Sequence, residues 1–574
     1  MKKQLQRWLD RDPDPVTRTE LQSLLESGNR DELNRRFSTR LKFGTAGLRG
    51  VVGGGPARMN RLVIRESSAG LGSYLLQQIG DAAQRGVVVA FDGRTDSRTF
   101  ARDAACVLAA LGIKVYFTPR ETATPIAAFG VLYFNAAAGV VVTASHNPPE
   151  YNGVKVYWEN GAQIIPPHDT GIAAAIEMAS DGEIPWVTFE DAVTAGTIVV
   201  LDEEFYRGYL DAIQNSPLFQ SDKSPTSTGI AYTAMHGVGA AIAETLLGDA
   251  GFDKVYSVGS QRDPDGRFPT VAFPNPEEPG AMDAVLALAR EHETTLACAN
   301  DPDADRLAVA VRTPEGDYQL LTGDMLGVLL ANYLLSKPHP FIPIVCTTIV
   351  SSSMLRSVAR AAGADYYETL TGFKWLANTA FSHEDGEHQF LFAYEEALGY
   401  APGRQVRDKD GLSALLAFAQ MTESLAHEGK TVLDQLHSLY LQHGIYLTAQ
   451  RSMALQADAR PVGELLRKAP PEHIGGHRVM QLDDFSVGTR RAADGSLEEL
   501  DFPRSDVLVY RLDNSSRVIV RPSGTEPKVK CYYEVVEKVA DGALDSGMAH
   551  ARSSLTRLID AHQTAVAQLC DAEV

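Results

Sequence analysis

The chain has few of the features that mark membrane or secreted proteins. Its 574 residues include five cysteines, an odd number without C-x-x-C spacing, which favours free thiols in a reducing compartment. The first residues, 1–8, lack the apolar core of a signal peptide. No charged residue lies between Thr122 and Ser145, but Pro125, Asn135 and two glycines interrupt that stretch, which favours a core helix followed by a core strand. We therefore expect a cytoplasmic protein with no membrane partner.

Positive charge is also scarce. The chain has 53 Lys and Arg residues against 73 Asp and Glu residues, a net charge of −20. This balance disfavours a nucleic-acid partner, because such partners are bound largely through phosphate contacts. A small anionic ligand would need locally concentrated Arg and Lys, since the overall field repels it. The 44% hydrophobic content is ordinary for a globular chain, and the length is sufficient for three to five domains.

Several common catalytic motifs are missing as well. The sequence contains no Walker A motif and no G-x-S-x-G nucleophile elbow. The segment 233–239 has two glycines of a dinucleotide fingerprint, but Ile242 stands where the third glycine belongs. We interpret it as a tight turn between a strand and a helix. Nucleotide-dependent and α/β-hydrolase chemistry are therefore poorly supported.

Strand and helix patterns alternate along most of the chain. Residues 87–91 are predicted to form a strand, 97–111 a helix and 114–117 the next strand. The same β–α–β order recurs in 229–258 and 342–366, which predicts mostly parallel sheets covered by helices. Ligands of such sheets gather at the carboxyl ends of the strands. From about residue 450 the pattern changes to hairpins and a final amphipathic helix, which indicates an α+β region.

A first candidate site loop follows the buried strand predicted over 138–142. It reads Thr-Ala-Ser-His-Asn-Pro-Pro-Glu-Tyr-Asn-Gly-Val-Lys over residues 143–155. The prolines and the Asn-Gly pair predict loop geometry. An exposed Ser145 beside His146 and near Lys155 is a candidate carrier of a phosphoryl or acyl group. A serine in a turn is more often only a turn residue, so this loop needs support from elsewhere.

A second candidate loop contains three carboxylates within five residues, Asp301, Asp303 and Asp305, followed by Arg306. Apolar runs on both sides predict that the loop joins two strands. Acids this close repel one another unless a hard cation lies between them, and an all-oxygen ligand set suits Mg²⁺ or Ca²⁺. An EF-hand is excluded because arginines occupy its glycine and glutamate positions. A metal site is favoured over a solvated acidic turn.

Two further loops are compatible with binding of a phosphorylated sugar. Glu395 and Glu396 follow an apolar run and are able to accept hydrogen bonds from sugar hydroxyls, although a helix N-terminus is the simpler interpretation of this pair alone. The segment 521–530 reads Arg-Pro-Ser-Gly-Thr-Glu-Pro-Lys-Val-Lys. An arginine, two hydroxyls and a glycine that admits close backbone approach suit a phosphate, whereas a plain hairpin turn is the alternative.

Taken in order, the four loops resemble the phosphoserine, metal, sugar and phosphate loops of the α-D-phosphohexomutase family, which includes phosphoglucomutase and phosphomannomutase. Residues 42–50, 371–374 and 407–411 are similar to further active-site segments of that family. The N-terminal segments 17–20 and 36–37 resemble its phosphoglucomutase-two-like and phosphopentomutase-like branch. The resemblance covers nearly the whole chain.

The resemblance implies a fold class: α/β, with three similar mixed or parallel α/β domains and a C-terminal α+β domain around a central active-site cleft. The expected domains are 1–205, with an N-terminal extension and the phosphoserine loop; 206–320, with the metal loop; 321–448, with the sugar loop; and 449–574, with the phosphate loop.

The resemblance also implies site residues. The catalytic residues are Ser145, His146, Lys155, Arg49 and Arg306, with the proton shuttle left open between His146 and Lys155. Mg²⁺ is held by Asp301, Asp303 and Asp305 and by a phosphoryl oxygen on Ser145. The substrate-binding residues are Lys374, Glu395, Ala397, Lys409, Arg521, Ser523, Gly524 and Thr525. Ala397 departs from the family pattern, which has serine at that position.

The implied activity is that of an intramolecular phosphotransferase. We expect interconversion of a sugar 1-phosphate and 6-phosphate, glucose first, through a phosphoserine and a sugar bisphosphate such as glucose 1,6-bisphosphate, which would also be the activator. A phosphopentomutase or a phosphomannomutase is the alternative with the same chemistry. A sugar-phosphate phosphatase is the alternative of another class, disfavoured because the Arg521 loop would hold a second phosphate. Sugar phosphates are the expected partners of a monomer or weak homo-oligomer.

Overall fold

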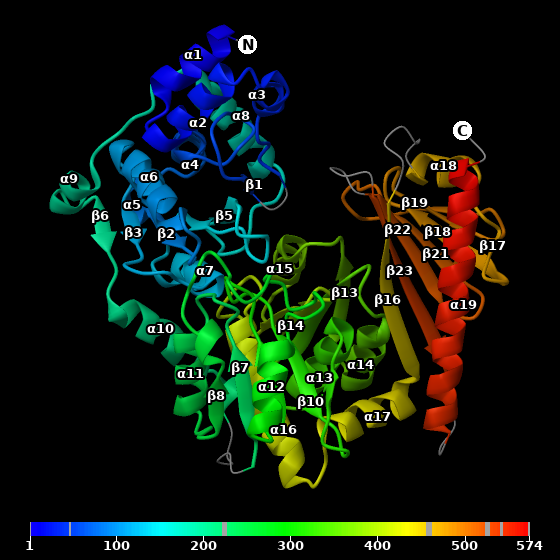
Figure 1. Ribbon diagram of the computed structural model, residues 1–574. Helices are drawn as coiled ribbons and strands as arrows, with labels where there is room; N and C mark the ends of the chain where they lie inside the picture. Colours follow the sequence, from blue (N-terminus) through cyan, green and yellow to red (C-terminus); the bar gives the residue numbers. More distant parts are fainter. Residues whose placement is uncertain are drawn as a thin grey trace. The chain divides into compact units, whose positions relative to one another are not determined.

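The computed structural model describes residues 2–44, 47–220, 227–454, 462–522, 528–539 and 543–571. Figure 1 labels its helices and strands. The chain divides into two compact units. Unit 1 comprises Met1–Leu321 and Phe390–Glu428, and unit 2 comprises Thr322–Gln389 and Gly429–Val574. Within these described ranges, no helix combines the length and the apolar character needed to cross a lipid bilayer.

Unit 1 begins with three short helices that precede its first sheet: α1 (Lys2–Arg11), α2 (Pro15–Glu26) and α3 (Arg30–Phe37). The side chains of Asp14 and Asn29 cap α2 and α3 by accepting hydrogen bonds from backbone amides of the first turn. Leu5, Leu21 and Leu33 are buried in the same core as the sheet that follows. The extension is therefore an integral part of unit 1.

The first sheet of unit 1 has the strand order β1-β5-β4-β2-β3-β6. Strands β4, β2, β3 and β6 run parallel to one another, whereas β5 is antiparallel to both of its neighbours, β4 and β1, so this sheet is mixed. Its strands are β1 (Leu48–Val51), β2 (Val87–Phe91), β3 (Val115–Phe117), β4 (Ala138–Val142), β5 (Tyr151–Trp158) and β6 (Ile198–Val200). Its helices are α4 (Arg61–Gln78), α5 (Ala82–Arg85), α6 (Ser97–Ala110), α7 (Thr124–Tyr133), α8 (His168–Asp181), α9 (Phe189–Thr194) and α10 (Glu203–Gln214).

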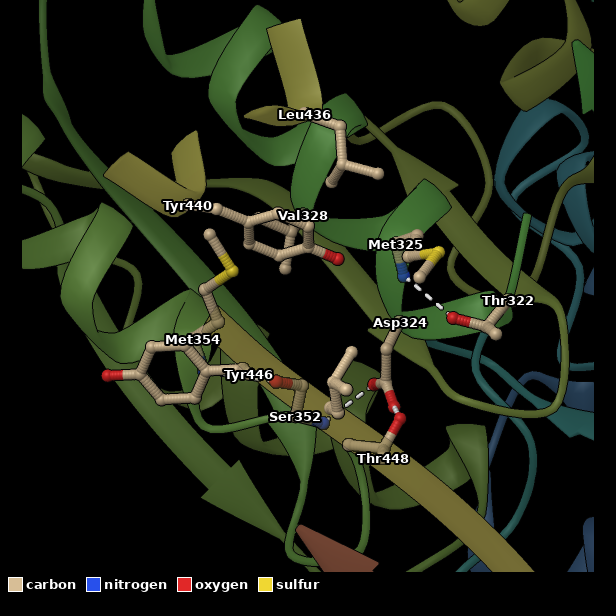
Figure 2. Close-up of a pocket in the computed structure, with 11 residues that line it drawn as sticks. Thr322, Asp324, Met325, Val328, Ser352, Met354, Leu436, Tyr440, Tyr446 and Thr448 are labelled. Carbon is tan, nitrogen blue, oxygen red and sulfur yellow. Dashed lines mark hydrogen bonds between the residues drawn. The ribbon is translucent and has the colours of Figure 1, made fainter. Parts of the chain in front are cut away.

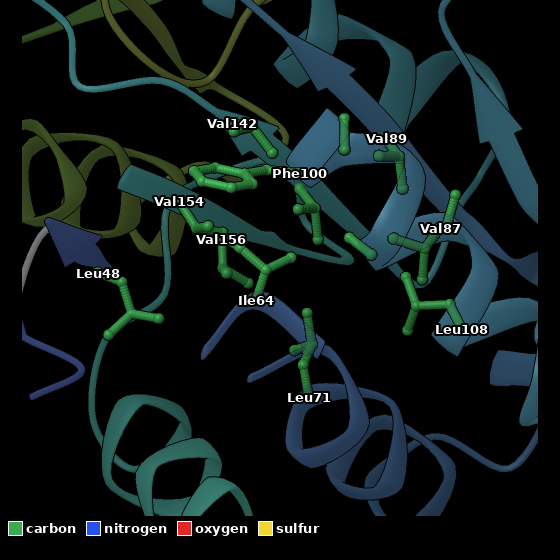
Figure 3. Close-up of a cluster of buried hydrophobic side chains, with 14 of the residues drawn as sticks. Leu48, Ile64, Leu71, Val87, Val89, Phe100, Leu108, Val142, Val154 and Val156 are labelled. Carbon is green, nitrogen blue, oxygen red and sulfur yellow. The ribbon is translucent and has the colours of Figure 1, made fainter. Parts of the chain in front are cut away.

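The core of this sheet forms from β-branched and other apolar residues that point from the strands toward the helices. Figure 3 shows Val87 and Val89 of β2, Val142 of β4 and Val154 of β5 gathered with Ile64 and other apolar residues of the helices. All five residues of β2 and of β4 are buried, as the unbroken apolar runs predicted. The carboxyl ends of β2 and β4 are thereby fixed next to each other.

The second sheet of unit 1 has the order β11-β10-β9-β7-β8. It is again mixed, because β7, β8 and β9 run parallel to one another whereas β10 is antiparallel to both of its neighbours, β9 and β11. Its strands are β7 (Ile230–Thr233), β8 (Val255–Ser257), β9 (Leu296–Ala299), β10 (Ala308–Arg312) and β11 (Tyr318–Leu320). Its helices are α11 (Ala240–Asp249), α12 (Asp283–Glu291) and the 3₁₀ turns η1 (Pro217–Phe219) and η2 (Gly259–Gln261). The later stretch of unit 1 adds β14 (His388–Glu395), β15 (Gly399–Pro402) and α16 (Gly411–His427).

Unit 2 contains another α/β layer and an antiparallel sheet. In the first, β12 (Ile342–Thr348) pairs in parallel with β13 (Asp365–Thr369). Its helices are α13 (Gly323–Leu335), α14 (Met354–Ala362), α15 (Phe373–Ser382) and α17 (Val432–His443). The predicted β–α–β order of 342–366 is confirmed.

The antiparallel sheet of unit 2 has the order β16-β23-β22-β21-β18-β19-β20, with β17 beside β18. Its elements are β16 (Ile445–Ala454), α18 (Val462–Lys468), β17 (His473–Ile474), β18 (His477–Asp484), β19 (Thr489–Ala492), β20 (Leu497–Glu499), β21 (Leu508–Leu512), β22 (Arg517–Pro522), β23 (Lys528–Glu537) and α19 (Leu544–Asp571). Helix α19 packs against β23 and β16, and it buries Leu558 and Ile559 with residues of the sheet. The predicted hairpin and final helix are both present.

Candidate active site

Ser145 lies in the loop between β4 and β5, in a backbone conformation that few residues adopt. Its φ is +51°, in the left-handed region, and its amide donates a hydrogen bond to Thr143 Oγ1 at 2.8 Å. The residue is only 4% exposed, so the prediction of an exposed serine was wrong. The turn residues do give the predicted loop, but other loops of unit 1 cover the serine side chain.

The three acids of the second loop lie next to this serine. Asp301, Asp303 and Asp305 are fully buried between β9 and β10, and one oxygen of each lies within 4.8 Å of the others. Ser145 Oγ donates a hydrogen bond to Asp301 Oδ2 at 3.0 Å. Two loops that are far apart in the sequence therefore meet at one point of unit 1, the arrangement that the family resemblance implied.

Two lysines partly balance the charge of the acids. Lys155 of β5 places Nζ 2.7 Å from Asp303 Oδ2 and 2.6 Å from Asp305 Oδ2. Lys409 places Nζ 3.3 Å from Asp305 Oδ2. Although burial opposes it, the attraction of Asp303 and Asp305 raises the pKa of Lys155, so this lysine is an ammonium at neutral pH. Lys409, predicted as a substrate contact, thus also belongs to the acid cluster.

The donor set of the acid loop fits a hard divalent cation. Asp303 Oδ1 and Asp305 Oδ1 are buried and accept no hydrogen bond from the described residues. Burial, followed by the charges of Asp303 and Asp305, raises the pKa of Asp301 well above its ordinary value. A doubly positive ion bound here would oppose that shift and would find oxygen ligands only, the set that Mg²⁺ prefers.

His146 and Arg49 complete the surroundings of the serine. His146 Nδ1 lies 3.3 Å from Ser145 Oγ. Burial, followed by the nearby Arg306 and Arg49, lowers the pKa of His146 well below its ordinary value, so the ring is neutral. Arg49 extends from β1 and donates from Nη1 to Asn147 Oδ1 at 3.0 Å. His146 therefore contacts Ser145 directly, whereas Arg49 contacts the serine loop two residues further along the chain.

The sugar-loop residues lie on a hairpin that contacts the acid loop. Glu395 is the last residue of β14, and Ala397 lies in the turn before β15. The alternative of a helix N-terminus for this glutamate pair was wrong. The amide of Leu307 donates a hydrogen bond to the carbonyl of Leu398 at 3.0 Å. The backbones of Arg306 and Gly399 form an isolated antiparallel β-bridge. Arg306, Glu395 and Lys409 are thus brought into one neighbourhood of unit 1.

The remaining predicted substrate residues fall in the sequence ranges of unit 2. Lys374 lies in the first turn of α15 and Arg521 near the end of β22, both in unit 2. Ser523, Gly524 and Thr525 lie outside the described residues. The substrate-binding role of all five residues stays a prediction.

A small cavity of unit 2 has none of the predicted site residues in its described lining. Its volume is about 30 Å³, and its polar end is formed by Asp324, which accepts hydrogen bonds from Ser352 N and Thr448 Oγ1, both at 2.6 Å (Figure 2). The rest of its lining comes largely from apolar and tyrosine side chains such as Val328 and Tyr440. A space of this size admits little more than water, so the acid cluster of unit 1 is the candidate active site.

Comparison with known protein families accounts for four parts of the chain. Three of them match the phosphoglucomutase/phosphomannomutase alpha/beta/alpha domains I, II and III, at residues 40–183, 207–316 and 322–443. The fourth matches the C-terminal domain of the same family, at residues 489–551. The chain belongs to the phosphoglucomutase/phosphomannomutase family. It has the three α/β domains and the C-terminal domain of this fold, and it is a phosphomutase, an isomerase that transfers phosphate intramolecularly.

Curated relatives of this phosphomutase family cover nearly the whole chain. A protein of Haemophilus influenzae described as "Probable phosphomannomutase" is 38% identical, over 86% of this chain and 97% of its own length. A Schizosaccharomyces pombe protein described as "Probable phosphoribomutase" is 37% identical, over 92% of each. A mouse "Glucose 1,6-bisphosphate synthase" is 33% identical, over 96% of this chain and 92% of its own length.

A solved structure of the same family has the same fold. It is a phosphoglucomutase/phosphomannomutase family protein of Burkholderia thailandensis, 22% identical, with a TM-score of 0.64 over 90% of this chain and 97% of that one. The predicted family and fold class are confirmed. The exact domain boundaries stay predictions.

The structure of this phosphomutase reveals two site residues that the sequence analysis missed. Arg94 follows β2, is 4% exposed, and donates hydrogen bonds to four carbonyl oxygens of the serine loop: Ser145 at 2.7 Å, Asn147 at 2.5 Å, Pro148 at 2.8 Å and Tyr151 at 3.0 Å. Thr124 Oγ1 donates to Asp303 Oδ2 at 2.7 Å. Arg94 could have been found from its position, because it follows a strand that ends beside β4; Thr124 carries no comparable signal.

Proposed function

We propose that this phosphomutase interconverts the 1- and 6-phosphates of a hexose, glucose first, through a phosphoserine at Ser145 and a sugar bisphosphate. The observation that carries the proposal is the 3.0 Å contact of Ser145 Oγ with Asp301 inside a buried cluster of acids and lysines. Phosphoryl transfer depends mainly on positioning and charge neutralisation, and this cluster supplies both beside one hydroxyl.

In the proposed reaction, the bond between phosphorus and Ser145 Oγ breaks while a bond forms between phosphorus and a free hydroxyl oxygen of the sugar monophosphate. The proton of that hydroxyl passes to a base. We assign this role to His146, because its neutral ring lies 3.3 Å from Ser145 Oγ, whereas Lys155 holds its proton between two carboxylates. The resulting bisphosphate turns over, and the bond between its other phosphorus and the sugar oxygen breaks as that phosphoryl group returns to Ser145 Oγ. His146 gives its proton back to the released sugar oxygen, and the isomeric monophosphate remains.

The charges around Ser145 support this transfer. Asp301, Asp303 and Asp305 would hold Mg²⁺, which when bound offsets negative charge on the transferring phosphoryl group. Arg49 and Arg306 are the cations proposed to contact the phosphate, and Arg521 the one proposed to hold the phosphate that is not reacting. The Asp triad alone leaves the identity of the metal open among hard divalent ions, so Mg²⁺ is part of the proposal.

A phosphopentomutase is the second candidate function. Ala397 offers no hydroxyl where the family pattern has serine, so one hydrogen bond to a ring hydroxyl is absent. Such a bond contributes about 0.5–1.5 kcal/mol net, which changes a hexose-to-pentose ratio by at most about tenfold. The phosphoribomutase relative favours the same candidate. We therefore expect turnover of glucose phosphate together with measurable turnover of pentose phosphate.

The proposal is tested by measuring the rate at which the protein isomerises the 1-phosphates of glucose, mannose and ribose. The assay contains Mg²⁺ and a trace of sugar bisphosphate. Intact mass should show one phosphoryl group on the wild type and on Ser23→Ala, an exposed control on α2, and none on the inactive Ser145→Ala. Active protein that never carries a phosphoryl group, with Ser145→Ala still active, would exclude the mechanism. Release of inorganic phosphate at the turnover rate would instead indicate a phosphatase.

The substrate is tested at Ala397. Ala397→Ser should shift the ratio of hexose to pentose turnover toward the hexose by up to about tenfold, because it restores one hydrogen bond. Ala397→Gly, which also lacks a hydroxyl, is the matched control and should leave the ratio close to that of the wild type. Equal ratios in the serine variant and the wild type would remove this position from sugar recognition.

A further inference from the structure

The N-terminal helices hold a glycine-rich turn that continues directly from β1. This turn, residues 53–58, follows the strand that carries Arg49 and precedes α4. Arg36 of α3 donates from Nη1 to the carbonyl of Gly54 at 3.2 Å, and Glu20 of α2 accepts from the amide of Gly54 at 2.9 Å. Both backbone polar groups of one turn residue are thus bound by side chains of the N-terminal extension.

The two side chains belong to one charged cluster, which we call the N-terminal clamp: Glu20, Glu32, Arg36 and Arg58. Arg36 forms ion pairs with Glu20 at 2.7 Å and Glu32 at 2.8 Å, and Arg58 of the turn pairs with Glu32 at 2.9 Å. The Arg36 side chain is only 11% exposed. The hydrogen bond from Arg36 lowers the pKa of Glu32 to about 2. Burial acts in the opposite direction, whereas the hydrogen bond from Arg58 lowers the pKa further, so the acid stays ionised at neutral pH.

The turn packs so closely against the N-terminal helices that a side chain at Gly54 or Gly55 would collide with them. A side-chain carbon added at Gly54 would lie 2.7 Å from Leu21 Cγ and 2.9 Å from the carbonyl of Thr17. Gly55 has a φ of +103°, a conformation that disfavours other residues, and its added carbon would lie 3.1 Å from Arg36 Cβ. The turn is therefore held by shape as well as by charge.

From the turn, the contacts lead along β1 to the candidate active site. Strand β1 pairs with β5, with Arg49 opposite Gly153, and the amide of Val52 donates to the carbonyl of Glu150 in the serine loop at 2.8 Å. Strand β1 is an edge strand, since β5 is its one neighbour in the described sheet. An edge strand has half the lateral support of a central one, so its position depends on what holds its ends.

We propose that Arg36 is a positioning residue for catalysis: through the N-terminal clamp it fixes β1, and thereby holds Arg49 beside Ser145 for contact with the phosphoryl group. The inference rests on the proposed function of Ser145 and Arg49. Arg36 touches neither the serine nor the acids in the described contacts, so its effect is exerted through the backbone of 50–54. The clamp gives a role to the sequence segments 17–20 and 36–37, which the phosphomutase chemistry alone leaves unexplained.

A double-mutant cycle tests the coupling. Arg36→Ala should lower kcat/KM for glucose 1-phosphate about tenfold, whereas in an Arg49→Ala background, assayed at raised enzyme concentration, it should add little. Arg30→Ala removes the same charge from the same helix at an exposed position that forms none of the ion pairs of the clamp, and it should behave as the wild type. Arg36→Lys should restore only part of the loss, since an ammonium lacks the planar fork that spans Glu20, Glu32 and the Gly54 carbonyl.

Amide hydrogen exchange supplies a measurement that does not depend on turnover. Arg36→Ala should speed exchange in β1 and leave the central strand β2 unchanged, whereas Arg30→Ala should alter neither. Equal exchange of β1 in the two variants, or additive effects in the cycle, would overturn the inference while leaving the proposed function intact. A wild type inactive on every sugar phosphate would overturn the proposed function, and this positioning role with it.

Discussion

Arg94 binds the backbone of the serine loop rather than a substrate group. Its guanidinium spans four carbonyl oxygens and also lies 3.3 Å from Asp92 Oδ2. Arg94 thereby fixes the segment in which Ser145 adopts its positive φ, a conformation that persists only when the surroundings determine it. The orientation of the nucleophile therefore depends on a residue that the chemistry itself does not require.

Arg94→Lys is expected to lower kcat by at least about tenfold, because one ammonium cannot reach four acceptors and each charged hydrogen bond lost removes about 1.5–3 kcal/mol. Steady-state kinetics with a phosphoserine assay by intact mass measures the effect. Arg98→Lys, at an exposed position on α6, is the matched control. Unchanged kcat in Arg94→Lys would mean that the loop holds its shape without this guanidinium.

Asp303→Asn is expected to weaken Mg²⁺ binding and to lower turnover about 100-fold, because one of three anionic ligands becomes neutral. Stability without metal should stay near that of the wild type, since repulsion among the acids falls and Lys155 keeps Asp305 as a partner. The Mg²⁺-dependent shift in Tm gives a readout besides activity. Asp317→Asn, 72% exposed, is the control, and an Asp303 variant with the wild-type Mg²⁺ shift would exclude the acid as a ligand.

At the scale of elements, the acid loop is closed by glycines that admit other backbone segments. An added carbon at Gly411, the first residue of α16, would lie 2.3 Å from the carbonyl oxygen of Arg306. An added carbon at Gly399 would lie 2.3 Å from Lys409 Cδ. The hairpin β14–β15 and the start of α16 thus approach the acids through positions without side chains.

Gly411→Ala is expected to destabilise the protein by about 1–3 kcal/mol, because the clash is with backbone that cannot move alone. Turnover should fall as well, since Arg306 and Lys409 flank the contact. The urea midpoint measures the first effect. Gly248→Ala in α11 meets no atom within 4 Å and should be neutral or stabilising by up to about 1 kcal/mol, so equal midpoints for the two variants would contradict the prediction.

The N-terminal clamp predicts a dependence of stability on pH. The pKa of Glu32 falls from 4.5 to about 2 on folding, so folding favours its ionised form. The stabilisation is fully present above pH 4.5 and is lost as the pH falls toward about 2. The free energy of unfolding should therefore decrease less steeply in Glu32→Gln than in the wild type over this window. Asp31→Asn, exposed on α3, is the control; parallel curves for wild type and Glu32→Gln would contradict the prediction.

Local patterns predicted the elements well and their contacts less well. The strands predicted at 87–91 and 138–142 have the observed bounds, because unbroken runs of buried residues mark them clearly. The acid loop was located correctly because charge crowding between two apolar runs is unusual. The burial of Ser145 and the role of Arg94 were missed, because both depend on loops that meet only in the folded chain. The hairpin at Glu395 was missed as an element for a related reason, since a glutamate pair also suits a helix start.

At the scale of the whole molecule, unit 1 is built from two stretches separated in the sequence by 322–389. The later stretch is bound firmly to the first: Tyr157 donates to Asp408 at 2.6 Å, Tyr209 to Asp410 at 2.9 Å, and Gln420 to the carbonyl of Phe219 at 2.6 Å. These contacts are buried, so leaving any of their partners unpaired would cost about 1–3 kcal/mol or more. Unit 1 is therefore one folding body despite its interrupted sequence.

This interruption sets an order of events during synthesis. The acids at 301–305 leave the ribosome well before Lys409, so the nascent chain passes through a stage in which Lys155 is the only one of the two lysines that faces the three carboxylates. During the same stage the hydroxyls of Tyr157 and Tyr209 lack their acceptors Asp408 and Asp410, which have not yet been synthesised. A gene fragment that stops at residue 321 would encode both sheets of unit 1 and all three acids. It would lack residues 390–428, which supply Lys409, Asp408 and Asp410, so the truncated protein would remain at this stage.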